Sequence, residues 1–168
     1  FYSRKEIRDV ISYLNLIANT SDNISFERVV NEPKRGVGPG TVEKIRNFAA
    51  GQEMSLLDAS SQIMLSPVKG KAAQAVFDFA NLILNLRERL EELTVTELVE
   101  LVLEKTGYTE QLVAQATLES QARIENIEEF LSVTKNFDED SENDTEETGL
   151  DRLSRFLNDL ALIADTDD

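Results

Sequence analysis

The chain has 168 residues, of which 41% are hydrophobic and 29% are charged, a balance typical of a water-soluble domain with a hydrophobic core. It contains no cysteine and no histidine, which excludes disulfides, thiolate chemistry and histidine-based metal binding or acid–base catalysis. The formal net charge of −15 is unevenly spread, because residues 1–89 hold 12 basic and 10 acidic side chains whereas residues 90–168 hold 5 and 22.

The first third of the chain predicts three helices. Ser3 and Glu6 form a capping-box pattern. The apolar residues that follow at helical spacing are Ile7, Val10, Ile11, Leu14 and Ile17. After a turn at Asp22, a short helix is expected to end at Pro33. A third helix is expected to start at Thr41 and to end with a C-cap at Gly51.

The middle of the chain continues this helical pattern. Ser55 and Asp58 indicate the start of a short helix, and Pro67 and Gly70 then interrupt the pattern. A long helix follows, with one apolar stripe composed of Ala72, Val76, Phe79, Ala80, Ile83, Leu86, Leu90 and Leu93.

The last third predicts further helices. A capping box at Thr94 opens one helix, which Gly107 closes, and Leu112 and Ala116 suggest a short helical turn. Two amphipathic helices then contain Ile124, Ile127, Phe130, Leu131 and Thr134 in the first, and Leu150, Leu153, Phe156, Leu157, Leu160 and Ile163 in the second. No hairpin of strands is indicated. We therefore expect an all-α fold, one compact multi-helix domain over residues 1–168 with short loops.

Residues 138–147 (DEDSENDTEE) contain seven acidic side chains and no apolar one. Such a segment cannot bury enough surface to offset its ordering entropy, so we predict an acidic flexible loop over residues 138–148. Its alternating acids resemble a calcium-binding loop. However, Asn143 stands where that loop needs glycine, and Gly149 stands where it needs a bidentate glutamate. We expect no metal site there.

The most informative segment is residues 33–45 (PKRGVGPGTVEKI), which contains what we call the glycine hairpin, residues 33–40. Glycine adopts positive φ at little cost, so Gly36 and Gly38 permit a tight turn that exposes backbone N–H groups before the next helix. N–H groups at a helix start bind phosphate well. Lys34, Arg35, Lys44 and Arg46 add positive charge. This pattern indicates a helix-hairpin-helix element that binds a nucleic-acid backbone without reading bases.

A second candidate site lies at residues 66–72 (SPVKGKA), where Lys69 and Lys71 bracket a helix start at Gly70. An ordinary loop with solubilising lysines explains this segment equally well. If both sites touch one duplex and neutralise two to four phosphates, the logarithm of the binding constant should fall with the logarithm of salt with a slope of roughly −2 to −4.

Other readings of the same residues remain open or fail. The glycine hairpin could be only a tight turn between helices, although a structural turn has no need of four flanking bases. A Walker phosphate loop fails, because Gly70-Lys71 is followed by Ala72 and preceded five positions earlier by Leu65. A dinucleotide fingerprint would need glycine in place of Thr41. We nominate no catalytic residue in this chain.

Several separated motifs resemble one family, the UvrD/Rep/PcrA-type superfamily 1 DNA helicases. The opening FYSRKEIRD is similar to the segment where these enzymes leave their second RecA-like domain, and residues 26–38 (FERVVNEPKRGVG) resemble their N-x-P-x-R-G-I-G element, with Val37 in place of isoleucine. Residues 95–99 (VTELV) and 121–135 (QARIENIEEFLSVTK) are most similar to the PcrA branch.

The resemblance covers essentially the whole chain and implies subdomain 2B, a helical insertion in a 3′→5′ motor that separates duplex DNA. It implies contact with the DNA backbone near a junction between single-stranded and duplex DNA. Together with the pattern above, it gives the candidate DNA-binding residues Lys34, Arg35, Gly36, Val37, Gly38, Gly40, Thr41, Lys44, Lys69, Gly70 and Lys71.

The resemblance also implies that ATP and Mg²⁺ serve a parent motor, whereas this chain needs no cofactor and has no ATPase activity of its own. Because the chain opens at Phe1, we expect an excised piece. The expected partners are duplex DNA, the motor domains and accessory proteins. No apolar run approaches the ~20 residues that cross a membrane, so we expect no membrane partner and a bacterial cytoplasmic location. The alternative is a protein-interaction or autoinhibitory helical module in which the hairpin is only a turn.

Overall fold

The computed structural model describes residues 1–143 and 146–167. Over these residues the chain is all-α, as predicted, with no β-strand. The helices are α1 (Lys5–Ala18), α2 (Asn23–Val29), α3 (Pro39–Gln52), α4 (Leu56–Ser61), a 3₁₀ helix η1 (Ile63–Leu65), α5 (Gly70–Glu88), α6 (Val95–Thr106), α7 (Tyr108–Gln115), α8 (Leu118–Asp140) and α9 (Gly149–Asp167).

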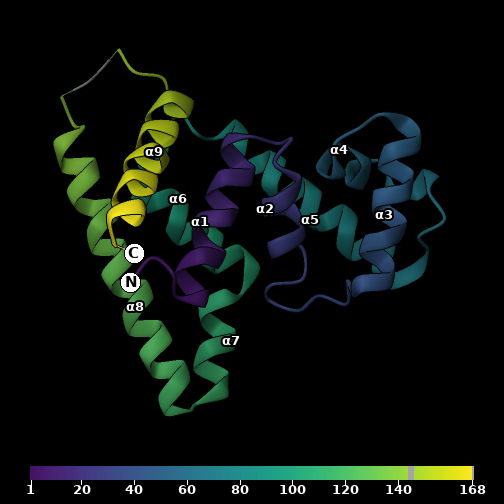
Figure 1. The fold of residues 1–168 in the computed structure, drawn as a ribbon, viewed down its shortest axis with the longest axis horizontal. Helices are drawn as coiled ribbons and strands as arrows, with labels where there is room; N and C mark the ends of the chain where they lie inside the picture. Colours follow the sequence, from purple (N-terminus) through teal and green to yellow (C-terminus); the bar gives the residue numbers. More distant parts are fainter. Residues whose placement is uncertain (144–145, 168) are drawn as a thin grey trace.

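Helix α1 is the centre of the fold and packs against α2, α5, α6, α8 and α9. Its apolar face is almost fully buried, as Ile7, Leu14 and Ile17 show no exposed surface. Each such side chain contributes about 1.5–3 kcal/mol of burial free energy. Figure 1 shows the result as two groups of helices, α6 to α9 on one side and α3 with α4 on the other, with α5 running between them.

Aromatic contacts join α5 to α1 and α2, and join α8 to α9. At the α5 side, the ring of Phe79 lies 5.5 Å from that of Phe26 and 6.2 Å from that of Tyr13. At the α8–α9 side, the ring of Phe156 lies 6.1 Å from that of Phe130 and 5.0 Å from that of Phe137. The Tyr13–Phe79 pair is tilted, and the other three are edge-to-face pairs, which add to simple burial.

Several predicted helix ends are confirmed. Ser55 accepts a hydrogen bond from the Asp58 N–H at the start of α4, and Thr94 and Glu97 form the capping box of α6. Gly107 ends α6 in the left-handed conformation, with φ +73°. The predicted turn at Asp22 is the N-cap of α2, whose carboxylate accepts from the Ser25 N–H.

Two predicted helix ends at the beginning of the chain were wrong. The Ser3–Glu6 capping box does not form: α1 starts at Lys5 without a side-chain cap, because the Glu6 carboxylate is buried and accepts from the Asn126 amide at 3.0 Å. The predicted C-cap at Gly51 lies inside α3, which ends instead at Glu53 with φ +55°. Tertiary contacts outweigh these local signals.

Two boundaries next to candidate sites also differ from prediction. Helix α3 starts at Pro39, two residues before Thr41, because proline fits the first helical position where its missing N–H costs nothing. The acidic loop was predicted to start at residue 138, but α8 continues to Asp140, so the loop starts after that residue. Asp138 accepts from the N–H groups of Val95 and Thr96, both at 3.0 Å, and so joins α8 to α6. Residues 144–145 of that loop lie outside the described residues.

Candidate nucleic-acid interface

The loop between α2 and α3, residues 30–38, is shaped by one side chain. The Asn31 Oδ1 atom accepts from the Arg35 N–H at 2.8 Å and from the Val37 N–H at 3.1 Å. Between these two bonds the chain turns at Gly36, whose φ of +79° lies in the left-handed region that favours glycine. The predicted turn at the glycine hairpin is therefore present, and Asn31 fixes its shape.

The start of α3 leaves backbone donors unpaired. Gly38 is the N-cap and provides no side-chain acceptor, and Pro39 follows as the first helical residue. Among the described residues, no acceptor pairs with the N–H of Gly40 or of Thr41, and Gly40 is exposed. These two N–H groups lie at the positive end of a helix dipole, where an anion is stabilised.

Two lysines flank this helix start. Lys34 and Lys44 are both exposed, and no carboxylate pairs with either in the part of the chain that the structure describes. Arg46, one turn further along α3, pairs with Glu27, with 3.0 Å between Arg46 Nε and Glu27 Oε1. Its charge is therefore partly compensated, and the uncompensated charge at the hairpin comes from lysine.

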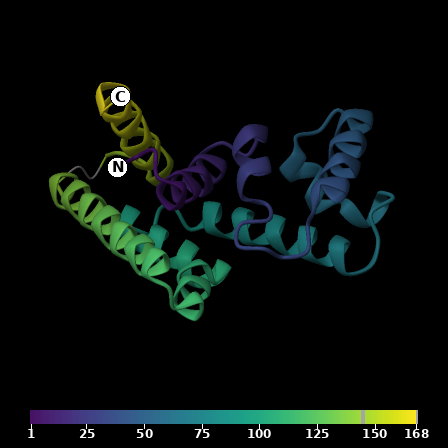
Figure 2. The same cartoon turned by 60° about the horizontal axis from the view of Figure 1, so that its bottom comes forward.

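The second candidate site lies at the start of α5. Lys69 is the N-cap residue without a side-chain cap bond, and Gly70 follows with φ +67°. Lys69, Gly70 and Lys71 are all exposed. Figures 1 and 2 both place this helix start at the same end of the molecule as the loop that leads into α3. The two predicted sites thus lie at the same end of the molecule.

Two predicted contact residues point inward instead. Val37 is buried, with 1% of its surface exposed, and its N–H is already bonded to Asn31. The Arg35 guanidinium is directed at the C-terminal end of α2, at Tyr13 within α1 and at the Phe79 ring. Val37 is buried and the half-buried Arg35 guanidinium is bonded to protein groups, so both side chains pack the loop against the core.

The whole chain matches one family model, the UvrD-like helicase C-terminal domain, over residues 1–168. The chain belongs to this family. Its predicted resemblance to UvrD-type helicases is thereby confirmed at the level of the family.

Curated relatives of this UvrD-like helicase C-terminal domain are named ATP-dependent DNA helicase PcrA. The chain is 49% identical over 167 residues to the protein of Bacillus subtilis (strain 168), which covers 99% of this chain. It is 46% identical over 169 residues to that of Leuconostoc citreum and 44% identical over 168 residues to that of Staphylococcus aureus (strain Mu50), each covering 100% of this chain. In each case the match spans 22% of the relative's own length.

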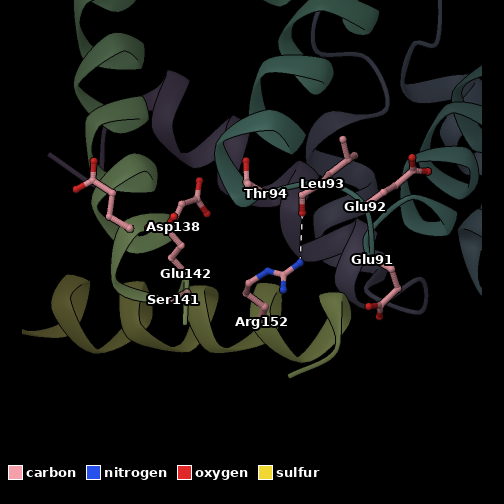
Figure 3. Close-up of a pocket in the computed structure, with 9 residues that line it drawn as sticks. Glu91, Glu92, Leu93, Thr94, Asp138, Ser141, Glu142 and Arg152 are labelled. Atoms are coloured by element: carbon pink, nitrogen blue, oxygen red, sulfur yellow. Dashed lines mark hydrogen bonds between the residues drawn. The ribbon is translucent and has the colours of Figure 1, made fainter. Parts of the chain in front are cut away.

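An acidic hollow lies away from the two candidate sites, where α8, α9 and the segment before α6 meet. Its volume is about 470 Å³, and Figure 3 shows its lining residues. Arg152 donates to the carbonyls of Leu90 and Leu93, both at 3.4 Å, and Glu91 accepts from the Gly149 N–H at 2.7 Å. These polar groups join helices. The described residues contain no group of three or more acidic side chains placed to hold a metal ion.

The described part of this domain contains no helix long and apolar enough to cross a membrane.

Because Tyr13 is buried below the hairpin, we expect the free energy of unfolding to fall at high pH. Burial raises the pKa of Tyr13 to about 12, although the nearby Arg35 opposes the shift. Its contribution to stability is complete below pH 10, where the unfolded chain also keeps the proton, and is lost as pH rises from 10 to 12. We expect a loss of roughly 2–3 kcal/mol over that range.

Urea titrations at pH 9 and pH 11.5 measure this loss, and Tyr13→Phe serves as the comparison. The substituted chain should be less stable at pH 9 but should lose less on going to pH 11.5. Equal losses for the two chains would show that Tyr13 does not titrate as described.

Sequence reasoning missed three residues that build the interface. Tyr13 contacts the hairpin from α1, and Phe79 contacts it from α5. Asn31 contacts it from within the loop between α2 and α3. The resemblance to the N-x-P-x-R-G-I-G element included Asn31, so the signal for that residue was present. Nothing in the spacing of Tyr13 or Phe79 distinguishes them from ordinary core residues.

Proposed function

We propose that the chain is subdomain 2B of a PcrA-type ATP-dependent 3′→5′ DNA helicase and binds the backbone of duplex DNA near the fork. The observation that supports this most is that two helix starts lie at one end of the molecule, each flanked by two exposed lysines that no carboxylate pairs with among residues 1–143 and 146–167. The helicase part of the proposal comes from the relatives, which are named ATP-dependent DNA helicase PcrA.

The proposed binding mode is non-specific and electrostatic. The N–H groups of Gly40 and Thr41 receive one phosphate at the start of α3, and Lys34 and Lys44 receive its neighbours. Lys69 and Lys71 approach a further phosphate at the start of α5. In this binding mode the chain forms a helix-hairpin-helix contact with phosphates and does not recognise bases. Such binding suits a motor that must pass over any sequence.

The role of the chain in the parent enzyme is proposed to be regulatory. The G-x-x-x-x-G-K-[ST] pattern is absent from this sequence, so ATP and Mg²⁺ would be bound by motor domains elsewhere in the longer protein. Holding the duplex ahead of the fork, the domain would orient the DNA relative to those motor domains. Accessory proteins remain candidates for the rest of its surface.

The salt dependence of DNA binding tests this proposal. We expect the wild-type chain to bind a tailed duplex weakly, with a slope of roughly −2 to −4. Lys34→Ala/Lys44→Ala removes two phosphate contacts and should reduce the magnitude of the slope by about 2. Fluorescence anisotropy of a labelled DNA between about 20 and 200 mM salt measures both values.

The matched control is Lys105→Ala/Lys135→Ala, which makes the same charge change on exposed lysines of α6 and α8. It should leave the slope unchanged. An equal effect of both double substitutions would mean that only net charge matters, and no effect of the hairpin substitutions would favour the interaction-module alternative. Failure of the wild-type chain to bind at about 20 mM salt would also contradict the proposal.

A further inference from the structure

We propose that Arg35 is a positioning residue of the interface, whose guanidinium binds the protein and holds the glycine hairpin in its phosphate-binding orientation. The inference deepens the proposed function and rests on it. It reverses the expected role of Arg35, which the sequence alone placed among the direct DNA contacts.

The hydrogen bonds of the guanidinium all lead to protein. Arg35 Nη1 donates to the carbonyl of Val29 at 2.8 Å and to that of Val30, and Arg35 Nη2 donates to Tyr13 Oη at 2.8 Å. Val29 and Val30 are the last residue and the C-cap of α2. A cation at this end of a helix satisfies free carbonyls and is stabilised by the helix dipole.

A ring completes the binding site of the guanidinium. Arg35 Cζ lies 4.8 Å from the centroid of the Phe79 ring, and Phe79 is only 2% exposed. Tyr13, the acceptor on the other side, is 1% exposed and donates in turn to the Glu32 carbonyl. The half-buried side chain therefore connects α1, α2 and α5 directly beneath the hairpin.

The backbone of Arg35 transmits this anchoring to the phosphate-binding groups. Its N–H is bonded to Asn31, and the next residue is the left-handed Gly36. With Arg35 held inward, the preceding Lys34 is exposed, and the chain after Gly36 leads to the free N–H groups of α3. Without the anchor, only a fraction of the molecules would present these groups correctly, and affinity would fall by that fraction.

Two substitutions separate positioning from the other possible roles. Arg35→Met removes the charge and the donors at similar length, and Arg35→Lys keeps the charge but lacks the planar fork. Binding is measured at a temperature where circular dichroism shows each variant fully folded. We expect both variants to bind the tailed duplex about 3–10-fold more weakly, with the slope of the wild-type chain retained.

Hydrogen exchange without DNA provides the second measurement. The amides of Arg35 and Val37, which are bonded to Asn31, should exchange about tenfold faster in both variants, while those of α8 keep their wild-type rates. Tyr13→Phe removes one hydroxyl and no charge, and should accelerate the same amides to a smaller extent. This variant keeps the test available if Arg35→Met does not fold.

Three results would overturn the proposal. A slope reduced by about 1 in Arg35→Met, as expected for Lys34→Ala, would show a direct phosphate contact. Unchanged affinity in the folded variants would show a role in stability alone. Unchanged exchange at the hairpin would show that Arg35 does not order it. Because exchange is measured without DNA, this last result is independent of the lysine test, which alone decides the proposed function.

Discussion

Gly149→Ala is expected to destabilise the chain by about 3 kcal/mol, at the upper end of the usual cost of overpacking. A Cβ atom at this position would lie 2.2 Å from the carbonyl oxygen and 2.4 Å from the carbonyl carbon of Leu90. Backbone atoms cannot rotate away as a side chain can, so α9 would have to move back. That movement would stretch the bonds from Gly149 to Glu91 and from Arg152 to Leu90.

The matched control for this substitution is Gly51→Ala. Gly51 lies inside α3, with nothing within 4 Å of an added Cβ, so alanine should stabilise the chain by about 0.5–1 kcal/mol. Urea denaturation gives both free energies of unfolding. If the two variants shifted stability in the same direction, the close approach of α9 to Leu90 would not be present in solution.

Asp9→Asn is expected to lower the free energy of unfolding by about 2–4 kcal/mol, because it removes the negative charge that compensates Lys5 on α1 and Arg28 on α2. Asp9 is 1% exposed. Its carboxylate accepts from Tyr108 Oη at 2.6 Å and from Lys5 Nζ at 2.9 Å, and lies 3.1 Å from Arg28 Nε. The upper part of the usual 3–5 kcal/mol range is not expected, since Lys5 and Arg28 keep partial contact with water.

Asp78→Asn makes the same chemical change on the exposed face of α5 and should alter stability by less than about 0.5 kcal/mol. Thermal unfolding of both variants against wild type measures the difference. A similar small effect for Asp9→Asn would mean that the buried carboxylate is replaceable by any polar group of its shape.

The helical fold could be predicted because its signals are local. Capping residues such as Ser55 and Thr94 act within their own first turn, and the structure confirms both. Where a distant residue competes for the same group, prediction failed, as at Glu6, whose partner Asn126 lies 120 positions away. No local pattern contains that information.

In the candidate site, too, the features set by local sequence could be predicted and those set by distant contacts could not. The turn at Gly36 and the start of α5 at Gly70 could be predicted, since each depends on what glycine alone allows. The direction of Arg35 could not, because a basic residue next to an exposed lysine has the same pattern whether it faces solvent or core. Only the assembled positions of Tyr13 and Phe79 decide between the two.

The separation of charge along the molecule has a kinetic consequence. The lysine-bearing end lies beside α3, whereas the strongly acidic residues 90–168 form α6 to α9 at the other end (Figure 1). Such a body has a large electric dipole moment, and the field of a polyanion exerts a torque on it before contact. Molecules that approach a duplex backwards would be turned around, so that rotational alignment precedes collision.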